Sequence, residues 1–154
     1  MNQKINYKYT ASGLDNVTLV DLDSVCDDDG DPCVTIPNIN GLHKTIAETI
    51  VNRQQGMSGK ELRFLRTLMG NTQAELGAKV DREGLTIGRW ERGEIAIEPN
   101  AEALIRLMAR EKLGLQLEVP VDQLTGWCIQ TAEAQPIRID ASNPEKYRAL
   151  DEAA

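Results

Sequence analysis

The chain has 154 residues, of which 41% are hydrophobic and 27% charged, and its formal net charge is −7. This length fits one domain or two small ones, and no apolar run is long enough to cross a bilayer. Residues 1–10 lack the apolar stretch of a signal peptide, and the three cysteines are few and odd in number. We therefore expect a cytoplasmic protein with reduced thiols.

The acidic charge is concentrated towards the two ends of the sequence. Residues 1–57 carry four cations and eight anions, and residues 113–154 carry three cations and seven anions. Residues 58–94 carry seven cations and six anions, a net charge of +1. A relatively cationic middle fits a segment that approaches phosphate. On charge alone, an ordinary acidic cytosolic protein explains the pattern equally well.

The N-terminal module predicted from the pattern is a β-hairpin followed by a helix. A polar, extended lead-in covers residues 1–16, and apolar positions then predict a strand over 17–26. The β-branched run within 33–36 predicts the returning strand. Apolar residues at helical spacing over 39–51 predict an amphipathic helix, and the polar linker after it sets the boundary of this module at 1–56.

Two local signals predict details of the N-terminal module. The pair Asp29-Gly30 is typical of a two-residue hairpin turn, and a turn there places Cys26 opposite Cys33. Asn40 is the expected cap of the helix, because its short polar side chain can accept a hydrogen bond from the first turn. The aspartates around the turn lack the spacing of an EF-hand calcium loop, so we interpret them as a solvated tip.

Residues 57–113 are predicted to form a helical domain. Ser58 with Glu61, and Thr72 with Glu75, have the spacing of capping boxes, so a helix is expected to begin at each pair. Glycines mark the ends of these helices, and a proline marks the start of the last helix. Together with the helix of the N-terminal module, five helices are expected, four of them in this domain.

The two central helices of this domain are joined by a tight turn. Leu76 and Val80 lie four residues apart on one face of the first helix. Ile87 and Trp90 restart an apolar face in the second helix, so Trp90 is expected in the core and not stacked on a base. The segment 81–84 between them breaks the pattern, and its Asp tolerates a left-handed conformation. This pattern predicts a helix-turn-helix.

Residues 114–154 are predicted to form a short mixed extension. Segments 115–119, 127–131 and 137–139 are strand candidates, and a terminal helix is expected within 143–150. The expected fold class is therefore mainly α with a small β part. It consists of an N-terminal β-hairpin plus helix, then a helix-turn-helix bundle of four to five helices, then this mixed C-terminal extension.

The central helix pair resembles a known family. Six positions match in register, without insertion, those of the Cro/repressor-type (XRE) helix-turn-helix regulators: Gln73, Leu76, Val80, Ile87, Trp90 and Glu91. The turn departs from that family, because it reads Asp, Arg, Glu where the family usually has Gly, an aliphatic residue, and Ser or Thr. With this turn, the segment is most similar to the MqsA-like antitoxins. The resemblance covers about residues 58–110.

The resemblance implies a sequence-specific, double-stranded-DNA-binding transcriptional repressor that autoregulates its own operon. In the MqsA-like branch the start of the second helix reads bases, and Arg89 matches the base-contacting Arg of that branch. Leu85 stands where the branch carries a base-contacting Asn, so a different operator is expected. One such helix reads half a site, so we expect a homodimer on a two-fold symmetric operator. Its dimer surface is expected outside 72–93, in 39–51 or 115–139.

The candidate DNA-binding residues fall into two groups. The exposed face of the second helix is predicted to comprise Gly84, Leu85, Thr86, Gly88 and Arg89. Arg89 can pair bidentately with guanine, and Leu85 or the Thr86 methyl can contact thymine methyls. The two glycines are expected to allow close approach to the groove. Phosphate contacts are assigned to Gln73, Lys60, Arg63, Arg82 and Arg92.

The antitoxin resemblance also implies an alternative role, in which the N-terminal module neutralises a partner toxin and the helix-turn-helix represses the shared operon. Many MqsA-like proteins hold zinc with two Cys-x-x-Cys pairs, but this chain has none. Cys26, Cys33 and His43 do not complete a tetrahedral site, so no metal or other cofactor is expected. No nucleophile–base pair and no glycine-rich phosphate loop is recognisable, so we expect no catalytic residue and no enzyme.

Overall fold

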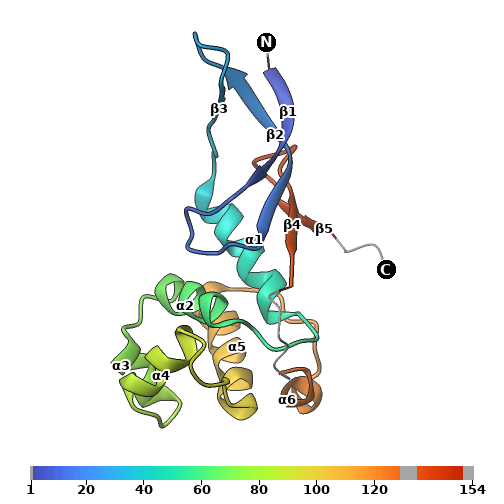
Figure 1. Cartoon of the computed structure of the whole chain (residues 1–154). Coiled ribbons are helices and arrows are strands. Elements are labelled where there is room, and N and C mark those ends of the chain that lie inside the picture. Colours follow the sequence, from blue (N-terminus) through green and yellow to red (C-terminus); the bar gives the residue numbers. More distant parts are fainter. Residues whose placement is uncertain (1, 129–134, 151–154) are drawn as a thin grey trace. The chain divides into compact units, whose positions relative to one another are not determined.

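A computed structural model describes residues 2–128 and 135–150 as mixed α and β structure (Figure 1). The chain divides into two compact units, unit 1 with Met1–Ile46 and Gln135–Ala154, and unit 2 with Ala47–Ala134. None of the helices described is both long and apolar enough to span a membrane. The elements in chain order are β1 (Asn2–Lys8), β2 (Val17–Cys26), β3 (Pro32–Val34), α1 (Ile39–Val51), α2 (Gly59–Leu68), α3 (Gln73–Lys79), α4 (Gly84–Glu91), α5 (Pro99–Leu113), the 3-10 turn η1 (Val121–Gln123), α6 (Leu124–Trp127), β4 (Ile137–Asp140) and β5 (Arg148–Leu150).

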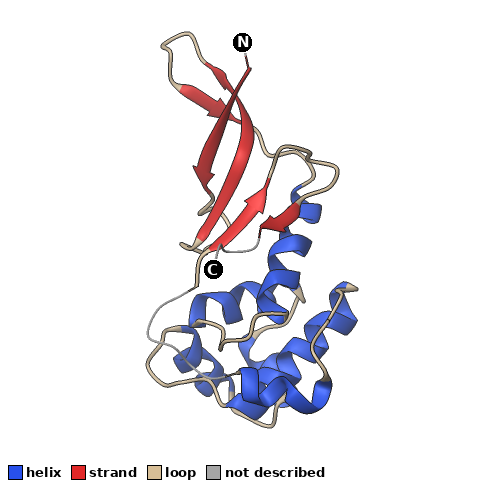
Figure 2. Cartoon of the chain, turned by 90° about the vertical axis from the view of Figure 1, so that its right-hand side faces the viewer, coloured by secondary structure: helices blue, strands red, loops and turns tan. Residues whose placement is uncertain are grey.

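Unit 1 contains a five-stranded mixed sheet, whose strands Figure 2 shows in red. β2 pairs antiparallel with β1 and β3 and parallel with β4, and β5 pairs antiparallel with β4. The parallel pairing places Val17 opposite Ile137 and Leu19 opposite Ile139, and all four side chains are buried. The strand expected at 137–139 is confirmed as β4. The expectation of a simple N-terminal hairpin is wrong, because strands from the C-terminal part complete the sheet.

The hairpin of β2 and β3 forms, but its register differs by one residue from the prediction. Cys26 lies opposite Pro32 and not opposite Cys33. The cause is the loop between the strands, in which Asp27 N–H donates to the Asp31 carbonyl at 2.8 Å. The Asp27 carboxylate accepts a hydrogen bond from Asp31 N–H, also at 2.8 Å. This aspartate side chain stabilises a loop longer than a two-residue turn.

Helix α1 begins and ends at the residues predicted from its apolar spacing. The residue that caps its start is Asn38 and not the predicted Asn40, which lies inside the helix. Asn38 has a φ of 55°, and its side-chain oxygen accepts a hydrogen bond from Gly41 N–H at 3.3 Å. Its carbonyl accepts from Leu42 N–H at 3.1 Å. Asn adopts this left-handed conformation more readily than most residues, which explains the choice of cap.

The C-terminal part differs most from the sequence prediction. The terminal helix expected within 143–150 is absent from the described residues, and β5 lies there instead. The Asn143 side chain accepts a hydrogen bond from Glu145 N–H at 3.1 Å, so a turn forms where a helix start is expected. Residues 115–119 form no strand, because the backbone groups of Gln116 and Glu118 bond to side chains of Glu48 and Asn52 and not to a neighbouring strand. Of the strand candidate 127–131, residues 129–131 lie outside the described residues.

Unit 2 contains the helices expected between residues 57 and 113. Both capping boxes form, and in the first the Ser58 hydroxyl accepts from Glu61 N–H while Glu61 accepts from Ser58 N–H. Pro99 begins α5, and Gly114 ends it with a φ of 68°. These local signals determine helix ends because they satisfy backbone groups that have no partner inside the helix. The expected count of five helices from α1 to α5 is confirmed.

A buried ion pair within α5 holds the segment that joins α1 to α2. Arg106 and Glu102 lie one turn apart, and their side chains, both fully buried, approach to 2.6 Å. The Arg106 guanidinium also donates to the backbone carbonyls of Arg53 and Gln55. Glu102 accepts a hydrogen bond from Met57 N–H at 3.1 Å. Each buried charge is thereby compensated, which is what makes its burial tolerable.

Cys128 lies beside this ion pair and is the buried thiol of the chain. Burial raises the pKa of Cys128 to about 12, and the charge of Glu102 contributes to the same rise. Burial also raises the pKa of Glu102, whereas the Arg106 guanidinium opposes that rise. The Cys128 thiol donates to the Leu124 carbonyl, with 3.2 Å between sulfur and oxygen. Cys128 is therefore a neutral core residue.

Replacing Glu102 should destabilise unit 2 strongly. Glu102→Ala leaves the charge of Arg106 buried without its carboxylate, so we expect a loss of roughly 3–5 kcal/mol in the free energy of unfolding. Urea titration followed by circular dichroism measures this loss. Glu111→Ala on the exposed side of the same helix is the control and should change stability by less than about 1 kcal/mol. Equal losses for the two variants would contradict the assignment.

Candidate nucleic-acid interface

Helices α3 and α4 of unit 2 are joined by a tight turn, as the sequence predicts, and we refer to this helix pair and its turn as the helix-turn-helix (Figure 1). The Thr72 and Glu75 capping box begins α3. At the turn, Asp81 has a φ of 57°, and Arg82 N–H donates to the Gly77 carbonyl at 2.8 Å. This bond satisfies a carbonyl at the end of α3 and stabilises the turn that follows. Trp90 is buried, which confirms its expected place in the core.

Two glycines permit the close approach of the helices at this turn. A Cβ atom on Gly77 would lie 2.5 Å from the Arg82 carbonyl oxygen, closer than real contacts allow. A Cβ atom on Gly84 would lie 3.1 Å from the backbone of Ala74. The start of α4 therefore packs directly on the backbone of α3. Gly84 is explained by helix packing, whereas the sequence interpretation assigned it to groove approach.

A single carboxylate connects α4 to the two preceding helices. Glu91 of α4 binds Arg66 of α2 through two hydrogen bonds, of 2.5 and 3.0 Å. The Gln73 side-chain amide of α3 donates to the same carboxylate at 3.2 Å. The Arg66 and Glu91 side chains are only 12% and 5% exposed. A bidentate pair of this kind fixes orientation as well as distance, so it determines which face of α4 points outward.

The outward face of α4 carries an apolar and a cationic side chain, four residues apart. Leu85 is 72% exposed, and the Arg89 side chain is exposed and makes no hydrogen bond or ion pair within the described residues. Residues at this spacing lie above one another on a helix. Thr86 and Gly84 are half-buried beside them. Gly88 is buried next to Gln73, so its expected place on the exposed face is wrong.

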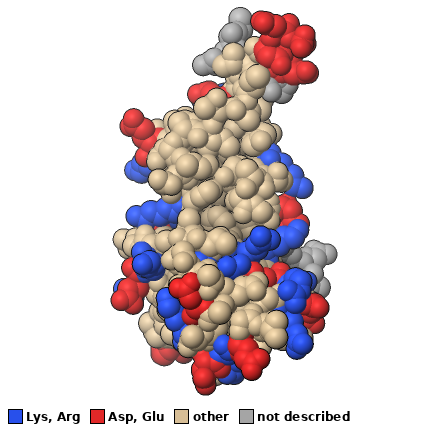
Figure 3. All heavy atoms as spheres, turned by 90° about the vertical axis from the view of Figure 1, so that its left-hand side faces the viewer, with Lys and Arg blue, Asp and Glu red and all other residues tan. Residues whose placement is uncertain are grey.

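The basic side chains assigned to phosphate contacts differ in whether a glutamate already pairs with them. Arg92 binds Glu94 at 2.7 Å, and Arg82 binds Glu98 with its guanidinium. The hydrogen bond to Glu98 is the largest cause of a raised Arg82 pKa. Lys60 and Arg63 of α2 are exposed. Figure 3 shows the result on one face, where basic and acidic side chains are interspersed over the helices.

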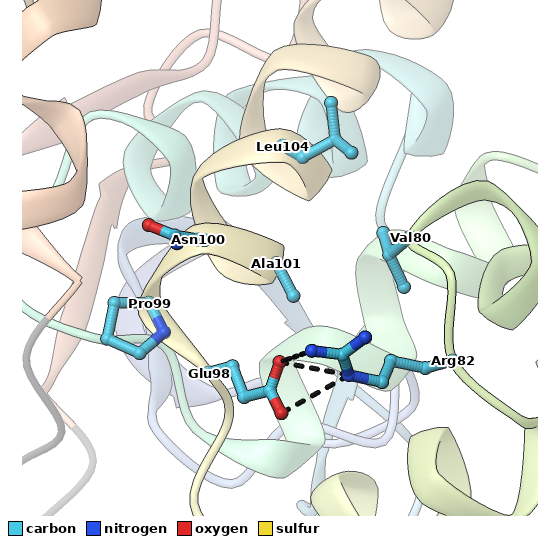
Figure 4. Close-up of a pocket in the computed structure, with 7 residues that line it drawn as sticks. All are labelled: Val80, Arg82, Glu98, Pro99, Asn100, Ala101 and Leu104. Atoms are coloured by element: carbon cyan, nitrogen blue, oxygen red, sulfur yellow. Dashed lines mark hydrogen bonds and ion pairs between the residues drawn. The ribbon is translucent and has the colours of Figure 1, made fainter.

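A shallow hollow adjoins the turn of the helix-turn-helix. It is lined by Val80 and Arg82 on one side and, at the start of α5, by Glu98, Pro99, Asn100, Ala101 and Leu104 on the other (Figure 4). The Arg82–Glu98 ion pair bridges it. Leu104 is 41% exposed at its edge. The ion pair links the turn to the start of α5, but both side chains are largely exposed, at 41% and 47%, so its contribution to stability is small.

The candidate zinc ligands, Cys26, Cys33 and His43, do not form a metal site within the described residues. Within residues 2–128 and 135–150, no three His, Cys, Asp or Glu side chains gather in a way that could hold a metal. His43 Nε2 is 2.8 Å from the Tyr9 hydroxyl, and burial lowers the pKa of His43. Cys26 and Cys33 are exposed thiols. Absence of bound metal stays a prediction.

Sequence reasoning missed Arg66 as a residue of this interface. It identified Glu91 by resemblance alone and did not single out Arg66. No pattern within α2 reveals the contact, because the two residues are 25 positions apart in the sequence. The buried pair of Glu102 and Arg106 was also missed, although its i, i+4 spacing is a recognisable signal.

Substituting Gly77 should unfold the turn of the helix-turn-helix. Gly77→Ala places a methyl group against the Arg82 carbonyl, so we expect a loss of roughly 1–3 kcal/mol in the free energy of unfolding. Gly126→Ala is the matched control, because a Cβ atom there meets no atom within 4 Å. Thermal unfolding by circular dichroism compares them. A Gly77→Ala variant as stable as Gly126→Ala would show that the close approach is not required.

Comparison with known proteins yields no relative for this chain. No family model, no curated protein and no solved structure matches it. The function must therefore be inferred from the residues and geometry described above.

Proposed function

We propose that this chain is a sequence-specific, double-stranded-DNA-binding transcriptional repressor of the Cro/repressor type, similar to the MqsA-like antitoxins and acting on its own operon. The observation that carries the proposal is the outward pair on α4, Leu85 with Arg89. A fully apolar side chain and an arginine without an internal partner are exposed on one face of a short helix whose other face is buried. The major groove admits such a helix.

The chemistry of this pair matches the edges of bases. The Arg89 guanidinium can donate two hydrogen bonds to the O6 and N7 atoms of guanine. The Leu85 side chain can contact the methyl group of thymine, which is the apolar group of the major groove. Leu85 is exposed to water in the free protein, so burial against DNA would remove apolar surface from water. Thr86 lies half-buried beside them and offers a further methyl group.

Phosphate contacts are supported unevenly by the structure. Arg63 is exposed and has no hydrogen bond or ion pair from its side chain within the described residues, so it can bind phosphate directly. Lys60 is exposed on the same helix. Gln73 is oriented by Glu91, which leaves its second amide hydrogen for a phosphate. Arg82 and Arg92 must first leave Glu98 and Glu94.

Arg89→Ala should remove base discrimination and leave general DNA affinity nearly unchanged. We expect a loss of roughly 1–3 kcal/mol for the DNA upstream of the chain's own gene and little for a scrambled duplex. Binding isotherms on both duplexes measure the difference. Arg110→Ala, an exposed arginine at the far end of α5, controls for the lost charge. Equal losses on both duplexes, with a folded variant, would refute base readout by Arg89.

Glu94→Gln should strengthen binding to any duplex. The substitution releases Arg92 from its ion pair, so the guanidinium can bind phosphate without first losing a carboxylate. We expect tighter binding to operator and scrambled DNA alike, and a salt dependence steeper by about 0.9 in slope, as for one more phosphate contact. Glu111→Gln is the matched control for the change in net charge. An unchanged salt slope together with an unchanged affinity would exclude Arg92 from the phosphate contacts.

A second candidate role is that of an antitoxin whose N-terminal module binds a toxin. One observation favours it: unit 1 is compact by itself and contains no residue of the helix-turn-helix, so it is available for another task. Co-purification with the product of the neighbouring gene tests this role. Failure of that test would leave DNA binding by unit 2 intact.

A further inference from the structure

Strand β1 is an edge strand of the sheet in unit 1. It pairs with β2 on one side, and within residues 2–128 and 135–150 no strand pairs with its other side. It has seven residues, whereas β3 and β5, which also lie at open edges, have three each. An open edge presents unpaired N–H and C=O groups that can bind another strand. β1 is therefore the longest open edge that the structure describes.

The backbone groups at this edge can be assigned. Tyr9, directly after β1, donates its N–H to the Val17 carbonyl of β2 at 3.0 Å. The direction of these groups alternates along an antiparallel strand. The groups of Lys4, Asn6 and Lys8 therefore point to the open edge. The register shift between β1 and β2 does not disturb this alternation, because the extra residue lies in β2, where Asp21 has a φ of 59°.

The side chains of β1 are divided between two faces. Ile5 and Tyr7 are half-buried and lie opposite buried leucines of β2. Lys4, Asn6 and Lys8 alternate with them and are exposed. Lys4 is already paired with Asp23 of β2 at 2.7 Å. The apolar face of the sheet is thus only partly covered at this edge.

We propose that β1 pairs antiparallel with β1 of a second copy of the chain, about a two-fold axis at Ile5. In this register Ile5 lies opposite Ile5 of the second copy, and Tyr7 lies opposite Gln3 of the second copy. The apolar face continues across the dimer and covers the half-buried side chains. Lys4 lies opposite Asn6 of the second copy. The backbone N–H and C=O groups of both residues point to the open edge of β1, so they can hydrogen-bond across the dimer. All seven residues of the strand take part.

The lysines select this register over its neighbours. A shift by two residues places Lys4 opposite Lys4 of the second copy in one direction, and opposite Lys8 of the second copy in the other. Like charges directly opposite one another destabilise a strand pair. A shift by one residue places residues whose backbone groups point to the open edge opposite residues whose groups point to β2. No continuous ladder of hydrogen bonds can then form between the two copies. The pairing centred on Ile5 therefore combines the longest overlap with no facing charges of like sign.

The edge of β1 differs from the dimer surface expected from the sequence, which was 39–51 or 115–139. Pairing at this edge does not depend on whether unit 2 binds DNA. The first measurement is light scattering on the full chain at micromolar concentration, without DNA. We expect twice the mass of one chain. A monomeric mass would overturn the proposal and leave the DNA-binding proposal to its own test.

Disulfide cross-linking tests the register. In a chain with Cys26→Ser and Cys33→Ser, Ile5→Cys should form a covalent dimer under mild oxidation, because facing Cα atoms in a non-hydrogen-bonded pair are about 4.5 Å apart. Gln3→Cys is the matched control, because its two copies would lie roughly 13 Å apart along the strands. Equal cross-linking of both variants, or none of Ile5→Cys in a dimer, would overturn the register.

Lys4→Pro provides a second test that does not depend on a cysteine variant. It removes an N–H that points away from β2, and proline is tolerated on an edge strand. We expect a monomer by light scattering with an unchanged circular dichroism spectrum. A dimer that survives this substitution would overturn the proposal. If Lys4→Pro does not fold, the cross-linking result decides.

Discussion

The orientation of α4 depends on the carboxylate of Glu91. This helix has eight residues, two of them glycines, and its first turn has no side-chain cap, so its own sequence stabilises it weakly. Glu91 compensates by binding Arg66 of α2 and Gln73 of α3 at once. Since both charged side chains are largely buried, separation would leave a charge without its partner in a poorly solvated place. The outward direction of Leu85 and Arg89 follows from this constraint.

The same principle operates at the other end of α2. Glu61 belongs to the capping box at the start of that helix and also binds Arg53 at 2.8 Å. The Arg53 carbonyl in turn accepts from Arg106 of α5. Polar groups buried in unit 2 are therefore linked from the segment before α2 to α5, while the Arg66–Glu91 pair connects its far end to α4. With both ends of α2 fixed by paired charges, the bundle has little freedom to rotate α4.

Much of unit 2 could be predicted from the sequence, because its determinants are local. Capping boxes at Ser58 and Thr72, the proline at 99 and the glycine at 114 each satisfy or release backbone groups within a few residues. The sheet could not be predicted in the same way, since the partner of β2 in the parallel pairing lies far along the chain. The predicted register of the hairpin was wrong by one residue. The Asp27 side chain, and not the turn signal at residues 29–30, closes the loop.

For the candidate site, spacing predicted which helix carries the outward side chains but could not predict which cations are neutralised. Residues 58–94 have a net charge of +1, and three of their arginines, Arg66, Arg82 and Arg92, are paired with glutamates. Under the proposed function, few phosphate contacts are then available, and attraction to random DNA is weak. Affinity for an operator must come from base contacts by Leu85 and Arg89, and a single short helix provides few of them. A second copy, placed by an interface outside the helix-turn-helix, would double those contacts without adding the cationic charge that attracts any duplex.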